Sequence, residues 1–235
     1  MISIQNIKLF LGIESPKLEV NNLELTTGLW ALVGRNGSGK STFLRALSGV
    51  NSKFEGTIFI NTKSQKSISA QQMAKLVSVV FSKSEIFGNH KAIDVLFLGR
   101  IPYQGVFSRV TKEDTKKVEE VVELLDLHAL INKRFSVLSD GERQLIMIGR
   151  ALVQDTKLIL LDEPTAFLDV VNRKKIVKIL ASVSTEKLIL FSTHNIDLIE
   201  EFCNGILLIN NNELISVDSK KEFKHQLETL FENEI

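Results

Sequence analysis

Cysteine, proline and long apolar runs are all scarce in this sequence. The 235 residues include one Cys, three Pro and 13 Gly, which excludes an internal disulfide and a low-complexity or collagen-like chain. No apolar run reaches the roughly 18–20 residues that span a bilayer. The first residues also lack the basic start and long apolar stretch of a secretory signal. We therefore expect a soluble, intracellular, globular protein.

An excess of charge of either sign is also missing. The 29 Lys and Arg residues nearly balance the 28 Asp and Glu residues, which leaves a net charge of +1. Such a balance gives no global attraction to nucleic acid or to anionic lipid, so no nucleic-acid partner is expected. A chain of this length can bury roughly 70–75% of its unfolded surface, and it needs no structural metal.

Short β-branched or apolar runs alternate with helical patterns along the chain. Thr111 and Asp114 form a capping-box pattern, and apolar residues then recur at helical spacing. Strands that alternate with helices predict an α/β fold with a mostly parallel sheet. The predicted strands are 29–33, 57–60, 76–81, 157–161, 188–192 and 205–209.

No linker-like tract divides the sequence, so we expect a single domain over residues 1–235. The segment from about 83 to 137 carries helix signals but no convincing strand, and it is interpreted as a helical subdomain inserted into a core of about 1–82 and 138–218. Asn210, Asn211 and Asn212 lie between two strand patterns and predict a hairpin. A charged amphipathic segment at about 219–235 predicts a C-terminal helix.

Residues 34–42 read GRNGSGKST and satisfy the phosphate-binding pattern G-x-x-x-x-G-K-[ST]. Glycines let backbone N–H groups converge on the phosphates, and the following helix adds its positive end. Lys40 supplies a mobile positive charge, and the Ser41 hydroxyl can ligate Mg²⁺. The predicted nucleotide cradle is Gly34, Arg35, Asn36, Gly37, Ser38, Gly39, Lys40, Ser41 and Thr42.

Residues 158–163 read LILLDE, an apolar strand that ends in two carboxylates. In a phosphate-loop fold, an Asp at such a strand end holds the water shell of Mg²⁺, and an adjacent Glu can polarise the attacking water. We therefore predict Asp162 as a metal-site residue and Glu163 as a catalytic residue. These motifs predict a bound nucleotide with Mg²⁺, and a phosphate loop alone leaves kinases, GTPases, helicases and transport ATPases open.

Residues 138–144, LSDGERQ, resemble the LSGGQ signature of ATP-binding-cassette (ABC) ATPases. The order of phosphate loop, insertion, signature, Asp-Glu strand and Ser192-Thr193-His194 is similar to that family over residues 1 to about 218. The resemblance implies a RecA-like P-loop core with N-terminal antiparallel strands and a homodimer that sandwiches two ATP molecules. Ser139 and Gly141 would face the ATP bound by the other copy, and His194 would be the switch histidine beside Glu163.

The sequence departs from the family pattern at several positions. Asp140 and Glu142 replace a glycine and a glutamine of the signature. Ser82 stands where the family usually has a glutamine that contacts Mg²⁺, and its shorter side chain could reach the ion only through water. The adenine-stacking residue is either Phe10 or Leu11, and packing in the core is an equal alternative for Phe10.

Two further residues keep ordinary structural alternatives. A histidine after a strand, such as His194, is more often a satisfied structural residue than a catalytic one. Asp169 resembles the family residue that couples the two ATP sites, although without that resemblance it would be read as a helix cap.

One cassette without fused membrane helices favours the free-standing ATPase of an importer. Residues 96–103, LFLGRIPY, resemble importers of the iron–siderophore, haem and cobalamin type. The resemblance implies integral membrane permease partners, an indirect periplasmic or lipoprotein substrate-binding protein, and a cytoplasmic location, peripheral on the inner face of the membrane. An importer of another solute and a soluble ABC regulator remain alternatives.

Overall fold

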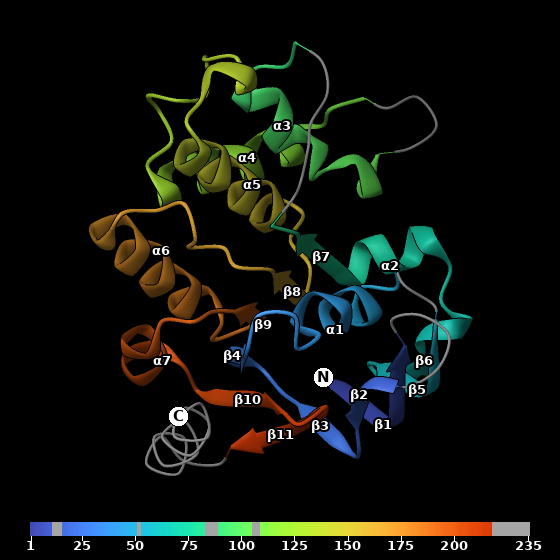
Figure 1. Cartoon of the computed structure of the whole chain (residues 1–235). Coiled ribbons are helices and arrows are strands. Elements are labelled where there is room, and N and C mark those ends of the chain that lie inside the picture. Colours follow the sequence, from blue (N-terminus) through green and yellow to red (C-terminus); the bar gives the residue numbers. More distant parts are fainter. Residues whose placement is uncertain (11–15, 51–52, 83–88, 105–108, 218–235) are drawn as a thin grey trace.

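The computed structural model describes residues 1–10, 16–50, 53–82, 89–104 and 109–217. Its framework is one eleven-stranded mixed sheet, in which ten strands follow the order β6-β5-β1-β2-β11-β10-β4-β9-β8-β7 and β3 pairs with β1 (Figure 1). The strands are β1 (Ile2–Phe10), β2 (Pro16–Val20), β3 (Leu23–Leu25), β4 (Gly28–Gly34), β5 (Phe54–Ile60), β6 (Lys63–Ser64), β7 (Val77–Val80), β8 (Leu158–Leu161), β9 (Leu188–Ser192), β10 (Gly205–Asn210) and β11 (Glu213–Val217).

The predicted α/β fold with a parallel core is confirmed. Strands β10, β4, β9, β8 and β7 are neighbours, and each pairs in parallel with the next. Buried parallel strands read as nearly continuous apolar runs, which is why these strands could be found in the sequence. Because they run in one direction, the segments that follow β4, β8 and β9 emerge at the same edge of the sheet.

The N-terminal strands implied by the family resemblance are antiparallel, since β1 pairs in that sense with β2, β3 and β5. The predicted hairpin is also present and joins β10 to β11. Its turn residues Asn211 and Asn212 have φ of 46° and 65°. Two successive positive φ angles are those of the tight turns that suit the twist of a hairpin.

Two predicted strands are shorter than expected, and β8 differs only in beginning at Leu158 rather than at residue 157. Leu76 is the last residue of a helix, and β7 covers only Val77–Val80 rather than residues 76–81. Ser69 caps the start of this helix and forms a capping box with Gln72. Pairing with β8 starts at Val77. The predicted C-terminal helix at 219–235 lies outside the described residues.

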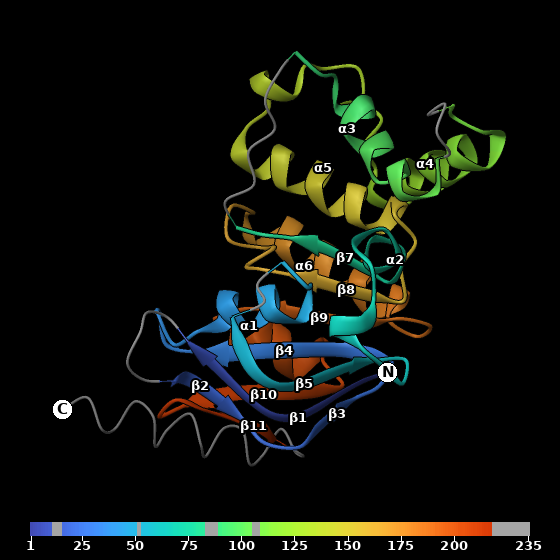
Figure 2. The same cartoon turned by 90° about the vertical axis from the view of Figure 1, so that its right-hand side faces the viewer.

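Helices cover both faces of the sheet (Figure 2). Side chains alternate between the faces of a strand, so Leu32 of β4 packs in one core with Phe43, while Leu29 and Ala31 belong to a second core with Val177. The α-helices are α1 (Lys40–Leu47), α2 (Ala70–Leu76), α3 (Ala92–Leu98), α4 (Lys112–Leu125), α5 (Asp140–Val153), α6 (Val170–Val183) and α7 (Ile196–Phe202), and the 3-10 helices are η1 (Gln65–Ser67), η2 (Ile101–Tyr103) and η3 (Phe135–Val137).

Helices α3, α4 and α5 pack together above the edge of the sheet that β7 forms (Figure 1). Thr111 caps α4 in a capping box with Asp114, as the sequence predicts. At its C-terminal end α5 is tied to the core, because Arg150 donates a hydrogen bond to the Val79 carbonyl at 2.8 Å and Gln154 donates one to the Val77 carbonyl at 3.1 Å. None of the helices in the described part of the chain is long and apolar enough to cross a bilayer.

A buried ion pair joins the end of α3 to α4. Arg100 Nε lies 2.8 Å from Asp114 Oδ1, and the two side chains are 5% and 4% exposed. A second guanidinium nitrogen of Arg100 donates to the Val153 carbonyl at 3.0 Å. Burial by itself would raise the pKa of Asp114, but hydrogen bonds from Arg100 and Thr111 outweigh it and leave that pKa lowered.

We expect Asp114→Ala to lower the free energy of unfolding by about 3–5 kcal/mol, because the buried Arg100 loses its counter-ion. Urea unfolding at neutral pH measures the loss. The carboxylate has a lowered pKa in the folded protein, so the difference from wild type should shrink as the pH falls through that pKa.

The matched control is Glu120→Ala on the same helix. This change removes exposed ion pairs with Lys116 and Lys117, and it should cost less than about 1 kcal/mol. Similar losses in Asp114→Ala and Glu120→Ala would contradict the importance assigned to the buried pair.

Candidate functional site

The loop between β4 and α1 has the shape of a phosphate cradle. Gly37 and Gly39 have φ of 76° and 110°, a left-handed backbone region in which side chains other than glycine are strained. The Lys40 side chain is 6% exposed and curls back over the loop. Its Nζ donates to the carbonyls of Gly34 at 2.7 Å and Arg35 at 3.1 Å.

Two carboxylates lie close enough to affect the charge of Lys40. Burial lowers the pKa of Lys40, and the charges of Glu163 and Asp162 oppose that shift. A cavity of about 170 Å³ lies between Glu163 and the loop. Its other lining residues are Asn36, Gly37, Gly39, Lys40, Ser41 and Thr42.

The Asp162 carboxylate, which follows β8, accepts hydrogen bonds from two serines. It is 3% exposed; its Oδ1 accepts a hydrogen bond from Ser192 at 2.8 Å, and its Oδ2 accepts one from Ser82 at 3.4 Å. The Asp162 backbone N–H also donates to the Val80 carbonyl at 2.8 Å, which holds the end of β7 alongside. The structure therefore brings the predicted metal-site residues Asp162 and Ser82 together.

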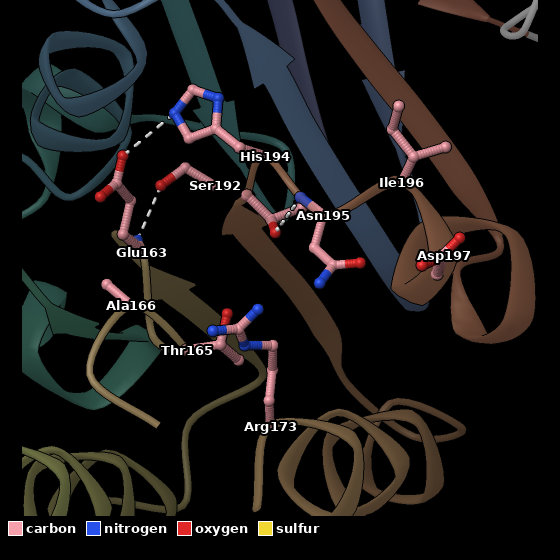
Figure 3. Close-up of a pocket in the computed structure, with 10 residues that line it drawn as sticks. Glu163, Thr165, Ala166, Arg173, Ser192, His194, Asn195, Ile196 and Asp197 are labelled. Atoms are coloured by element: carbon pink, nitrogen blue, oxygen red, sulfur yellow. Dashed lines mark hydrogen bonds and ion pairs between the residues drawn. The ribbon is translucent and has the colours of Figure 1, made fainter. Parts of the chain in front are cut away.

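Glu163 and His194 face each other across the ends of β8 and β9 (Figure 3). His194 Nε2 lies 3.3 Å from Glu163 Oε1, and both side chains remain partly exposed. Glu163 has a φ of 50°, which is uncommon for a residue with a Cβ. Both residues line a second cavity of about 470 Å³, together with Thr165, Ala166, Arg173, Ser192, Thr193, Asn195, Ile196 and Asp197.

The sequence alone does not reveal the part that Ser192 plays at this site. Besides its bond to Asp162, the Ser192 Oγ accepts a hydrogen bond from the Glu163 backbone N–H at 2.8 Å. The available signal is a hydroxyl at the end of an otherwise apolar strand, two residues before His194.

The signature segment begins α5 with a complete capping box. The Ser139 Oγ accepts from the Glu142 N–H at 3.3 Å, and the Ser139 N–H donates to Glu142 Oε2 at 2.8 Å. The backbone hydrogen bond from Ser139 is the largest cause of a lowered pKa at Glu142. Asp140 lies on the surface, 3.4 Å from Arg143. Both departures from the family signature therefore have local partners.

The contacts described for the signature residues of this chain lie outside its own phosphate loop. The Ser139 hydroxyl is engaged with Glu142. Gly141 lies against the loop before α6, where an added Cβ would come within 2.8 Å of the Phe167 carbonyl oxygen. Asp169 caps α6 by accepting from the Asn172 N–H at 2.9 Å, which is the ordinary structural alternative for that residue.

Phe10 is the half-buried last residue of β1, and Leu11 lies outside the described residues. The choice between the two as the adenine-stacking residue stays a prediction.

The oxygen donors at the site fit Mg²⁺, because the Ser41 hydroxyl and the Asp162 carboxylate are hard oxygen ligands of the kind that Mg²⁺ prefers. Together with the Lys40 loop they suit Mg²⁺ bound to a triphosphate.

Comparison with known proteins agrees with this geometry. The family model described as "ABC transporter" matches residues 18–166. An uncharacterized ABC transporter ATP-binding protein of Methanocaldococcus jannaschii is 33% identical over 222 residues, which are 92% of this chain and 75% of the relative. The iron(3+)-hydroxamate import ATP-binding protein of Bacillus subtilis is 28% identical over 197 residues, covering 83% of this chain and 73% of the relative.

A solved structure of similar fold is an ABC transporter assigned to the metal-chelate type, in an inward-facing conformation. It has a TM-score of 0.81 and 26% identity, and the match covers 98% of this chain and 88% of that one. Other relatives are named for the import of ribose, molybdate or methionine. The relatives are therefore all ABC ATP-binding proteins, but they are named for the import of different solutes.

We expect Lys40→Ala to weaken ATP binding by roughly 10–100-fold, the usual effect of losing hydrogen bonds to a charged group. Titration with a fluorescent ATP analogue measures the affinity. Lys63→Ala, which changes an exposed lysine on β6, is the control and should bind as wild type does. Unchanged affinity in Lys40→Ala would refute the role given to the loop.

Proposed function

Since this chain belongs to the ABC transporter family of ATP-binding proteins, we propose that it is the ATP-hydrolysing subunit of an importer that takes up an iron chelate. The observation that carries the proposal is the meeting of three motifs at one edge of the sheet. The Lys40 loop, Asp162 with Glu163, and His194 all follow parallel strands. Glu163 joins them, because it lines the cavity at the Lys40 loop and lies 3.3 Å from His194.

In the proposed mechanism the chain's own groups hold ATP and aim a water molecule at it. Lys40 leaves the loop carbonyls to pair with phosphate oxygens, and the positive end of α1 supports the same charge. Glu163 hydrogen-bonds and polarises the attacking water, while His194 orients the Glu163 carboxylate and binds the γ-phosphate. Mg²⁺, when bound near Ser41 and Asp162, neutralises charge on the phosphates.

Two features favour a homodimer with ATP between the copies. The start of α5, with Ser139 and Gly141, is engaged away from the chain's own phosphate loop. Large apolar side chains are also exposed near the starts of α5 and α6, where a soluble monomer gains nothing from them. They are Val137 at 69%, Phe167 at 53%, and Val170 and Val171 each at 77% exposure.

The proposed docking surface for a membrane permease is the segment 96–103. Leu96 is fully buried in the core, but Leu98, Ile101 and Tyr103 are 37%, 55% and 38% exposed. An apolar surface of this kind suits a membrane subunit better than water. The chain would then act at the inner face of the membrane, and a periplasmic or lipoprotein substrate-binding protein would reach it only through the permease.

Three observations support an iron chelate as the solute. The segment 96–103 resembles importers of that type. Some iron-chelate members of the family also have a small hydroxyl residue at the position of Ser82, which lies 3.4 Å from Asp162 in place of the more usual glutamine. The iron-hydroxamate relative and the metal-chelate type structure agree with this class. The relatives named for other solutes support the second candidate, an importer of a different small molecule.

We expect Glu163→Gln to abolish ATP turnover and to accumulate ATP-bound dimers, because the amide cannot polarise water but still permits closure around ATP. Light scattering after size exclusion, with and without ATP and Mg²⁺, measures the dimer. Glu186→Gln, at an exposed position before β9, is the control and should turn over normally. A Glu163→Gln protein that stays active and monomeric would contradict the mechanism.

The transport role and the solute are tested together in cells. We expect the tagged chain to co-purify from detergent-solubilised membranes with a polytopic membrane protein. Deletion should abolish the uptake of at least one radiolabelled iron chelate among siderophore, haem and cobalamin-like compounds. Uptake loss confined to a non-chelate solute would favour the second candidate, and an absence of any membrane partner would favour a soluble ABC regulator.

A further inference from the structure

The Ser192 hydroxyl connects the two carboxylate residues of the site. It donates to Asp162 Oδ1 and accepts from the Glu163 backbone N–H, and both distances are 2.8 Å. Figure 3 shows the hydroxyl directed at the Glu163 backbone. The Ser192 side chain is 0% exposed, so bulk water cannot take over either hydrogen bond.

The bond to Glu163 supports an unusual backbone conformation. Glu163 has a φ of 50°, and residues with a Cβ persist in this region only when their surroundings hold them there. The Ser192 Oγ binds the Glu163 N–H on one side of the turn, and the Ala166 N–H binds the Glu163 carbonyl at 3.2 Å on the other. This turn sets the direction in which the Glu163 carboxylate faces His194.

The bond to Asp162 fixes the plane of a second carboxylate. Ser192 holds Oδ1, and Ser82 lies 3.4 Å from Oδ2. The two contacts are unequal, because the Ser192 bond is short and fully buried, whereas Ser82 is an exposed residue. Ser192 is therefore the stronger determinant of where Asp162 points.

We propose that Ser192 is a positioning residue that sets the Asp162 carboxylate and the Glu163 turn relative to each other. Removing the Ser192 hydroxyl therefore lowers the affinity for Mg²⁺ through Asp162, and the same substitution misaligns the Glu163 carboxylate. This inference rests on the proposed roles of Asp162 and Glu163, and it adds one buried group through which both act.

A merely structural serine is the alternative, and the chain offers a matched control for it. Ser78 lies on β7, is 1% exposed, and accepts a hydrogen bond from Thr156 Oγ1 at 3.1 Å. Ser78→Ala and Ser192→Ala therefore each remove one buried strand hydroxyl. Only Ser192→Ala removes it from the carboxylates of the site.

The experiment compares the full-length proteins in two ways. Steady-state ATP hydrolysis gives kcat and KM, and a fluorescent non-hydrolysable ATP analogue gives the Mg²⁺ concentration that half-maximally tightens nucleotide binding. For Ser192→Ala we expect kcat to fall by about 10–100-fold and the required Mg²⁺ to rise by about tenfold, as is usual when an outer partner of a metal ligand is lost. KM for ATP should change by less than about threefold.

Ser192→Cys covers the case in which Ser192→Ala does not fold. It nearly preserves the side-chain volume but exchanges the hydroxyl for a weak donor and acceptor, and both readouts should move in the same direction. Wild-type turnover or a wild-type Mg²⁺ response in the folded Ser192 variants would overturn the proposal, as would an equal loss in Ser78→Ala.

Two further variants separate this inference from the proposed function. If Glu163→Gln and Asp162→Asn lose turnover while the Ser192 variants behave as wild type, the positioning role alone is wrong. If Glu163→Gln and Asp162→Asn keep turnover, the site assignment fails, and the role of Ser192 fails with it.

Discussion

The register between the parallel strands β4, β9 and β8 determines how the functional residues of the site are placed relative to one another. Leu32 pairs with Ser192, and Leu161 pairs with Phe191, so the phosphate loop, Asp162 and His194 leave the sheet side by side. Side chains alternate between the faces of a strand, and a slip of one residue would turn the Ser192 hydroxyl to the opposite face. Two apolar cores, one on each face, hold that register.

Local patterns predicted the parts of the fold that local forces determine. The buried parallel strands, the Thr111 cap and the Asn210–Asn212 turn each carry their own sequence signal. Strands β1, β2 and β3 were expected only from the family resemblance, and β1 is stabilised by pairing with three other strands. The boundary at Leu76 was misplaced for a related reason, since β7 begins only where β8 provides a partner.

The sequence motifs of the site could be predicted, but the hydrogen bonds that link those motifs in space could not. Residues 34–42 and Asp162-Glu163 are contiguous signals, whereas the link through Ser192 requires a contact between residues about thirty positions apart. The signature shows the same limit. Glu142 reads as a departure from a family pattern, yet in space it completes the cap of α5 and lies 3.3 Å from Lys133.

The two ends of helix α5 are attached to the rest of the protein in different ways. Its C-terminal end is hydrogen-bonded to the core through Arg150 and Gln154, whereas at its other end Gly141 lies against the Phe167 carbonyl with no side chain between them. At 1.5 Å per residue the helix is about 20 Å long. A tilt of about 10° at the fastened end would thus displace Ser139 by roughly 3.5 Å, which is comparable to the length of a hydrogen bond.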